Sequence, residues 1–328
     1  MLKPLAILFG LLIATTASAQ SVPPQQIVTP VDPLTMGTDD FTRLADPALW
    51  DGLTVTRIEF RDDRAFWRLY RIDNVRKPAG PLWFVPHDNE NAAFQAALYA
   101  VRAYGGQVIA VEEARSLAGP DSRMNGDVAY GKPIDPNRNF RAETPNYVNE
   151  ILAGLGAPAR LIVALHTNEP GYDSSASTCG PQLPAYTGRG EISVLLCNDL
   201  YMPRRSVSED WPFDDTDSVA IVSYPGSGGP GDGYCVQALA DADMNIMLER
   251  VMTSDGSLSN FALFNGLPYV NLETQDRGVT PAGLGDARSR LLAMIGIVMN
   301  RCALIDGLKL RPPRPPEPIR PGKRKKHR

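Results

Sequence analysis

The chain has 328 residues, of which 43% are hydrophobic and 21% charged, and this balance is typical of a globular protein with a sizeable core. It excludes disorder throughout, a collagen-like chain and a coiled coil. The formal charge of -4 conceals an asymmetry, because residues 309–328 contain nine Lys or Arg and one Glu, which leaves a charge of -12 on the other 308 residues. With only three histidines, imidazole chemistry has few places to occur.

The first residues have the order of a secretory signal peptide: Lys3, then the apolar run 5–14, then small residues up to Ala19. We expect residues 1–19 to be cleaved off after Ala19 and the mature protein to be periplasmic or secreted. A membrane anchor is the weaker alternative, because ten apolar residues fall short of the roughly 20 that cross a bilayer.

The sequence after this segment predicts an α/β fold. Residues 20–50 are rich in Pro, Gln, Thr and Asp, and we expect an extended lead-in. The β-rich segments 54–61 and 65–72 predict a hairpin. Beyond them, buried-strand patterns alternate with helical ones, which favours a mixed or largely parallel sheet between helices, with a catalytic domain over 51–308. The strands are expected at 81–85, 107–111, 161–165, 194–196, 219–222 and 269–272, and the helices at 91–104, 147–155, 235–252 and 287–305.

Residues 309–328 are rich in proline and basic side chains and predict a disordered tail that cannot form a core. The tail is either a solubilising terminus or a segment that binds an anionic cell-wall or membrane surface. Nucleic acid is not expected as the partner of an exported chain.

Four cysteines stand at positions 179, 197, 235 and 302, an even number that suits disulfides in an oxidising compartment. Three pairings are possible, and Cys179 with Cys197 is the local one, because turn-rich sequence lies between them. A zinc site made of these cysteines is disfavoured, since C-x-x-C spacing and neighbouring histidines are both absent from the sequence.

Both histidines outside the tail directly follow predicted buried strands. His87 and Glu90 come after the strand at 81–85, and His166 comes after the strand at 161–165. In open α/β sheets, ligands bind outside the carboxyl ends of the strands. Because imidazole and carboxylate suit zinc, we predict that these three residues hold one zinc ion. The alternatives are an acidic capping turn and a hydrogen-bonded core histidine.

Two further motifs supply groups that amide chemistry needs. Glu273 ends the last predicted strand, and its carboxylate is suited to take a proton from a zinc-bound water. Arg138 offers a planar donor fork that matches a carboxylate, and Asn137 adds another donor. The alternatives are a solvent-facing strand residue for Glu273 and a polar turn for the other two.

The order of these motifs resembles that of the zinc carboxypeptidases of the carboxypeptidase A type. H-x-x-E after a strand, D-x-N-R-N-aromatic at residues 135–140, a strand ending in His and a strand ending in Glu cover residues 81 to about 280. The resemblance implies a mixed sheet of about eight strands flanked by helices and one zinc ion held by His87, Glu90 and His166. It also implies that Glu273 is the general base and acid.

The same resemblance implies the remaining roles. Asn137 and Arg138 would hold a substrate carboxylate, Arg123 would stabilise the oxyanion, and Tyr234 or Tyr224 would be the tyrosine of the substrate loop. The aspartoacylase and succinylglutamate desuccinylase branch is the competitor, because residues 87–90 are similar to its H-G-N-E and residues 135–138 to its D-L-N-R. It ranks second, since its members are typically cytoplasmic.

Together these patterns predict an exported zinc-dependent amide hydrolase, a carboxypeptidase that acts on peptides, with cell-wall peptides as one candidate. The first alternative is an N-acyl amino acid deacylase. The second is a wall-binding protein that keeps the scaffold without turnover. In both enzymatic interpretations the substrate carries a free carboxylate.

Overall fold

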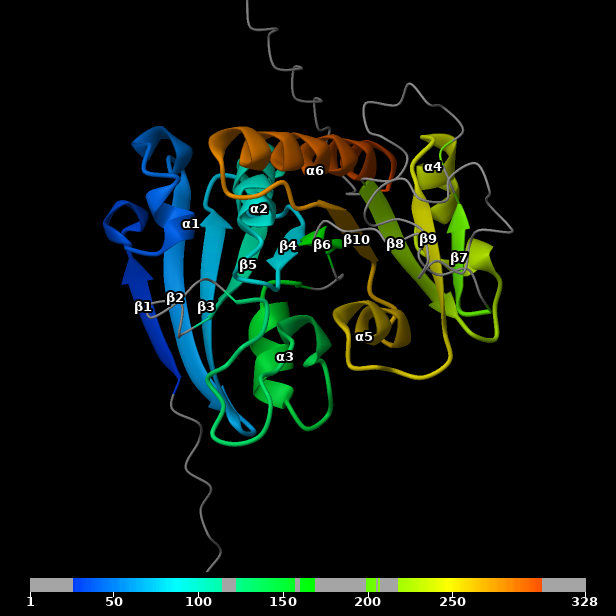
Figure 1. The fold of residues 1–328 in the computed structure, drawn as a ribbon, viewed down its shortest axis with the longest axis horizontal. Helices are drawn as coiled ribbons and strands as arrows, with labels where there is room; N and C mark the ends of the chain where they lie inside the picture. Colours follow the sequence, from blue (N-terminus) through cyan, green and yellow to red (C-terminus); the bar gives the residue numbers. More distant parts are fainter. Residues whose placement is uncertain are drawn as a thin grey trace, which may run out of the picture.

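The computed structural model describes residues 26–113, 122–156, 160–168, 199–204, 206 and 218–302. Within these residues, ten strands form one sheet in the order β1-β2-β3-β5-β4-β6-β10-β8-β9-β7 (Figure 1). Helices α2 (Asn91–Tyr104) and α6 (Pro281–Arg301) cover one face of the sheet, and α3 (Pro145–Leu152) and α5 (Leu258–Phe264) cover the other. The expected α/β sandwich is therefore confirmed, with ten strands in the described part instead of about eight.

The first three strands are antiparallel. The predicted hairpin is confirmed as β2 (Leu53–Asp62) and β3 (Ala65–Asn74), and β1 (Ile27–Val31) pairs with the outer side of β2. The expected lead-in thus contributes to the fold. Its helix α1 (Asp39–Thr42) carries Phe41, which is buried and stacks on Trp50.

Four parallel strands form the centre of the sheet: β5 (Gln107–Glu112), β4 (Leu82–Val85), β6 (Ile162–Asn168) and β10 (Tyr269–Gln275). Their apolar side chains enter the core on both faces, as continuous apolar runs predict. Parallel pairing brings the carboxyl ends of these strands to one edge of the sheet. This edge is where the polar motifs follow the strands.

The last three strands in the sheet order are β8 (Ser218–Pro225), β9 (Ile246–Val251) and β7 (Tyr201–Arg204). The helix predicted over 235–252 is wrong, because α4 (Val236–Asp241) ends after six residues and the chain continues as β9. Asp243 adopts a positive φ of 59°, which ends the helix. Among the described strands, parallel pairing is limited to the central four and to β8 with β9, so the sheet is mixed.

A disulfide joins Cys235, before α4, to Cys302, after α6. The local pairing expected for Cys179 with Cys197 lies outside the described residues, as do the strand expected at 194–196, the expected signal peptide and the basic tail. Among the described helices, none is both long and apolar enough to cross a membrane. Short 3-10 helices occur at η1 (Pro33–Thr35), η2 (Pro47–Leu49), η4 (Pro136–Arg138) and η7 (Pro230–Asp232).

Candidate active site

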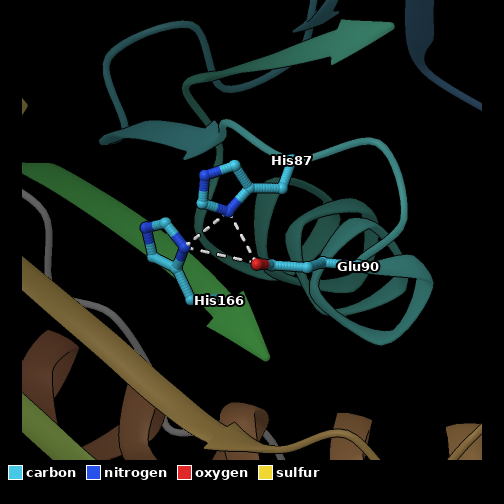
Figure 2. A group of neighbouring side chains, drawn as sticks. All are labelled: His87, Glu90 and His166. Carbon is cyan, nitrogen blue, oxygen red and sulfur yellow. Dashed lines mark hydrogen bonds and ion pairs between the residues drawn. The ribbon is translucent and has the colours of Figure 1, made fainter. Parts of the chain in front are cut away.

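Three side chains from separate elements converge where β4 and β6 end (Figure 2). His87 lies in the turn after β4, Glu90 directly precedes α2, and His166 belongs to β6. The parallel pairing of β4 with β6 brings both histidines to the same edge of the sheet. All three residues are at most 2% exposed. The structure thus places together the residues predicted as metal ligands.

The spacing of their polar atoms fits a zinc ion. The Nδ1 atoms of His87 and His166 are 3.2 Å apart, and oxygens of Glu90 lie 2.6 Å from the first and 3.3 Å from the second. A tetrahedral zinc ion with bonds of about 2.0–2.1 Å holds neighbouring ligand atoms about 3.3 Å apart. Two imidazoles and a carboxylate are also ligands that zinc favours, so both the donor set and its spacing are suitable.

Neighbouring groups hold these ligands in place. Asp135 Oδ1 lies 3.0 Å from His87 Nε2, which orients the ring so that Nδ1 faces Glu90. The carboxylate of Glu90 accepts a hydrogen bond from the backbone N–H of Thr167 at 3.0 Å and another from the Arg123 guanidinium at 2.7 Å. Each oxygen of Glu90 therefore has a fixed donor as well as a histidine beside it.

The charges in this cluster shift the pKa values of its members. Burial acts to lower the pKa of His87, but the carboxylates of Glu90 and Asp135 outweigh it and raise that pKa. Burial acts to raise the pKa of Glu90, yet the two histidines beside it hold this pKa well below the usual range. Burial also opposes ionisation of Asp135, but its hydrogen bond with His87 lowers the pKa. Two ionised carboxylates therefore face the imidazoles, and their negative charge favours a bound cation.

Glu273 lies one strand away from His166. β10 pairs in parallel with β6, and the register places Glu273 beside His166. Adjacent strands are about 4.8 Å apart, and paired residues point to the same face. Asn168 donates a side-chain hydrogen bond to Oε2 of Glu273, and Asn271 donates one to Oε1 at 2.9 Å. The carboxylate predicted as a base is therefore oriented by two amides beside the metal ligands.

Asn137 and Arg138 lie on η4, which Asp135 caps by accepting a hydrogen bond from the backbone N–H of Asn137 at 2.8 Å. Because Asp135 also bonds His87, this turn is tied directly to a predicted ligand. Arg138 has a side chain that is 54% exposed and pairs with Asp255. A cavity of about 430 Å³ opens beside Asp135 and Arg138. Arg138 thus lines a cavity that Asp135 connects to His87, whereas Asn137 does not line it.

The other two predicted residues differ in placement. Arg123 reaches Glu90 and so belongs to the cluster. Tyr234 is not brought there, because it follows β8, which runs antiparallel to β10 and ends at the opposite edge of the sheet. Its hydroxyl donates to the backbone carbonyl of Cys302 at 2.8 Å. Tyr224, the alternative, is buried in the core beneath α2 and α6.

Three residues that contact the site carried no predicted role. Asp135 begins the D-x-N-R motif, so the motif itself marked its position. Asn168 follows His166 by two residues, and Asn271 precedes Glu273 by two. Because strand side chains repeat with a period of two, this spacing places each asparagine on the same face as its neighbour.

Comparison with known proteins gives matches in structure alone. No protein-family model matches the chain, and no curated protein matches it in sequence. The succinylglutamate desuccinylase of Chromobacterium violaceum is 14% identical, with 73% of this chain and 70% of that chain covered and a TM-score of 0.36. The ectoine utilization protein EutE (DoeB) of Ruegeria pomeroyi is 14% identical, with 84% and 70% covered and a TM-score of 0.39.

A candidate metallopeptidase of Shewanella denitrificans OS217 is 13% identical, with 87% of this chain and 99% of that chain covered and a TM-score of 0.39. At such low identities and TM-scores, what this chain binds or cleaves has to be inferred from its own residues.

Proposed function

We propose that this protein is an exported zinc-dependent amide hydrolase that acts as a carboxypeptidase on peptides. The observation that supports this most is the convergence of two imidazole Nδ1 atoms and one carboxylate beside Glu273. Three protein ligands are typical of catalytic zinc sites, in which the fourth position is left for water or substrate. Zinc held by these residues would polarise the substrate carbonyl and lower the pKa of a bound water towards about 7.

The chain's own residues would move the protons. Glu273 would take a proton from the attacking water as its oxygen bonds to the amide carbon. The same carboxyl group would then give this proton to the leaving nitrogen as the carbon–nitrogen bond breaks. Asn168 and Asn271 keep the carboxylate pointed at one position during both transfers. Arg123 would donate to the carbonyl oxygen as negative charge develops on it.

Recognition of a terminal carboxylate is assigned to η4. Arg138 presents an exposed guanidinium at the rim of the cavity, and a planar fork binds a carboxylate through two parallel hydrogen bonds. Asn137 would add an amide donor. Because Asp135 links this turn to His87, the distance between the carboxylate and the scissile bond would be set by a rigid connection. This arrangement suits a substrate cleaved next to its free carboxyl end.

The compartment and the tail limit the choice of substrate. The signal-peptide pattern of residues 1–19 supports export, where short wall-derived peptides are available to a bacterial enzyme. The nine basic residues of the tail would hold the protein on an anionic wall or membrane surface by charge. Cell-wall peptides are therefore our first candidate substrates.

A deacylase that acts on N-acyl amino acids is the second candidate. The similarity of residues 87–90 to H-G-N-E and of residues 135–138 to D-L-N-R favours it. Such an enzyme would use the same ligands and the same base, and it would differ only in the group on the acyl side of the amide. A panel of peptides with free carboxylates, assayed beside N-acetyl and N-succinyl amino acids, separates the two by their kcat/KM values.

Metal analysis of the purified mature protein tests the shared part of both proposals. We expect about one zinc ion per chain, and we expect a chelator to abolish amide cleavage until zinc is added back. His87→Ala should lose the metal, whereas His327→Ala, which changes the histidine of the basic tail, should keep it. If neither the parent protein nor the control contained metal, both enzymatic proposals would be wrong. Metal binding without cleavage of any amide would favour the wall-binding alternative.

A further inference from the structure

The edge of the sheet opposite the proposed active site carries a group of basic side chains. Arg76 and Lys77 lie in the loop between β3 and β4. Arg102 lies in the last turn of α2, which leads into β5, and Arg160 comes two residues before β6. All four residues therefore stand where the central parallel strands begin, at their amino ends. We call these four residues the basic edge.

Backbone carbonyls hold three of these side chains close to one another. Lys77 Nζ donates to the carbonyl of Ala103 at 2.9 Å, and Ala103 adjoins Arg102 at the end of α2. Arg160 Nη1 donates to the carbonyl of Pro78, which adjoins Lys77. Each contact uses only part of the donors of a lysine or arginine. The three cations thus share one small surface and keep donors for another partner.

Positive charge exceeds negative charge at the basic edge. Arg76 forms an ion pair with Asp51, and the two side chains are 65% and 66% exposed. Asp46, in the adjoining turn, adds a second exposed carboxylate, whereas Asp73 at the end of β3 already pairs with Arg71. Four cations therefore stand beside two carboxylates. The excess is local, because the residues outside the tail sum to a charge of -12.

The loop that carries two of these cations also exposes apolar groups. Residues 75–79 are all exposed, and Val75 is 57% exposed. Asn74 Oδ1 accepts hydrogen bonds from the backbone N–H groups of Arg76 and Lys77, so the start of the loop is held in place. An apolar side chain flanked by cations suits a lipid bilayer, which offers anionic headgroups above an apolar layer. A hydrated wall polymer offers the charge alone.

The basic tail starts from the same edge of the sheet. Ala92 near the start of α2 packs with Ala287 near the start of α6, and Tyr104 at the end of α2 lies near Gly296 of α6. The two helices therefore run in the same direction, and both end at the basic edge. The disulfide at Cys302 fixes the end of α6, from which the chain continues towards the nine basic residues of 309–328.

We propose that the basic edge, with the loop 75–79 and the tail, docks this protein on a bilayer that contains anionic phospholipid. The proposal rests on the export assigned under the proposed function and is independent of amide cleavage. The cations contact headgroup phosphates, and Val75 enters the boundary of the apolar layer. From Arg160 to His166, six residues of extended chain span about 20 Å, more than twice the screening length at physiological salt. The metal-ligand cluster thus faces away from the membrane.

Co-sedimentation with vesicles tests the charge of the basic edge in the full mature chain. Vesicles of phosphatidylglycerol and phosphatidylcholine in equal amounts should bind the protein, and vesicles of phosphatidylcholine alone should not. Lys77→Glu should weaken binding by about 20- to 30-fold, since one cation near an anionic membrane is worth about fivefold in affinity and the reversal counts twice. Lys132→Glu makes the same change on an exposed lysine beside the tip of the β2–β3 hairpin, near the active-site edge, and should alter binding by less than about threefold.

A second matched pair tests the apolar contact. Val75→Ser should weaken vesicle binding by about three- to tenfold, because it removes apolar surface that leaves water on docking. Val279→Ser is the control, since Val279 is 56% exposed but follows β10 at the active-site edge. Equal effects of the two changes would overturn insertion of the loop.

The orientation has its own measurement. Hydrogen exchange of the parent chain on vesicles should slow at residues 75–80 and stay as in solution at residues 131–139, which lie near the active-site edge. Equal weakening by Lys77→Glu and Lys132→Glu, or slowed exchange at both segments, would mean that no face is preferred and would overturn the docking surface. Retention on insoluble wall polymer without binding to anionic vesicles would overturn the bilayer as the partner.

These measurements separate the docking surface from the proposed function, because none of them needs turnover. Vesicle binding that depends on Lys77, in a protein that cleaves no amide, would keep the docking surface and refute the hydrolase. Amide cleavage by a protein that ignores anionic vesicles would do the reverse.

Discussion

Two glutamates near opposite ends of β10, the buried Glu90 and the half-buried Glu249, have opposite surroundings. At the carboxyl end of the strand, Glu90 is beside two histidines and accepts hydrogen bonds from Arg123 and Thr167. At the amino end, Glu249 has the hydroxyl of Ser223 as its hydrogen-bond donor. The pKa of Glu90 is lowered despite burial, because nearby positive groups outweigh it, whereas burial raises the pKa of Glu249. Burial alone does not decide the charge of a carboxyl group; its partners do.

The difference also separates a preformed set of ligand atoms from a single carboxylate. The group around Glu90 is tied together by its own hydrogen bonds, so its ligand atoms are already positioned for a small ion. Glu249 is half-buried, and among the described residues its carboxylate has one hydrogen bond, from Ser223, so its surroundings do not position a set of ligand atoms. Changes at the first place should therefore act on chemistry and metal, and changes at the second on stability.

The largest effect is expected from Glu273→Gln. This change removes the proton acceptor and keeps the side chain's size, so kcat should fall by about 10²- to 10⁴-fold. The metal content should stay as in the parent protein, because Glu273 is not among the three ligand residues. Steady-state kinetics and metal analysis of the same preparation measure both quantities. Glu59→Gln, on β2, is the matched control, and a variant at Glu273 that kept full kcat would refute the assigned base.

Removal of the disulfide tests whether a loss of stability around Cys235 and Cys302 affects the metal-ligand cluster. Cys235 and Cys302 are 67 residues apart in sequence, and a loop of this length is associated with about 4 kcal/mol of stabilisation in the chain-entropy model. The double variant Cys235→Ser/Cys302→Ser should lose about 2–4 kcal/mol of unfolding free energy in urea titrations. Zinc content should be unaffected, since the bond lies outside the ligand cluster. Loss of zinc from a folded double variant would show that the two regions are coupled.

Asp135→Asn tests how strongly the carboxylate beside His87 supports this one predicted zinc ligand. Asparagine retains an oxygen that accepts from His87 Nε2 but loses the charge, so zinc affinity should fall by about 10- to 100-fold. Competition with a chromogenic chelator measures the dissociation constant directly. Asp51→Asn provides the same change on an exposed side chain and should leave affinity unaltered. Equal affinity in both variants would mean that the charge of Asp135 does not support the metal site.

The sequence predicted the region around Glu90 well and the region around Glu249 poorly, for physical reasons. The central strands are continuous apolar runs, and a polar residue directly after such a run must lie at the strand's carboxyl end, so His87 and His166 were placed by pattern alone. Glu249 sits in a segment of good helix formers that was predicted as helix. Its position depends on pairing between β8 and β9, a long-range contact that local preference does not encode.

Asp135 illustrates an intermediate case. Its motif was recognised, but its contact with His87 joins residues 48 apart in sequence, and only the folded chain brings them together. Tyr234 shows the opposite problem, because the resemblance offered it as the tyrosine of the substrate loop while the sequence did not show where it would lie. The antiparallel direction of β8 takes it to the far edge of the sheet. Strand direction, which the sequence does not show, decides between these outcomes.

The smallest expected effect is the change in melting temperature caused by Glu249→Gln. The test lies in how this change depends on pH. A carboxyl group whose pKa is raised by folding contributes stability that is fully present below the unfolded pKa, about 4.3–4.5, and lost as pH rises through the folded pKa. Charged Glu249 therefore costs stability at neutral pH, and the neutral amide removes this cost while still accepting from Ser223. Without substrate, the variant should melt at a higher temperature than the parent at pH 7.5 and show no such advantage at pH 4.

Glu59→Gln makes the sign of that result interpretable. Glu59 pairs with Arg57 and Arg68, so removal of its charge breaks existing ion pairs and should lower the melting temperature slightly at pH 7.5. Opposite signs for the two Glu→Gln changes, in thermal scans under identical buffer conditions, would follow from the contrast between a paired and an unpaired carboxylate. If Glu249→Gln also lowered the melting temperature at pH 7.5, then the charge of Glu249 would already be compensated within the protein.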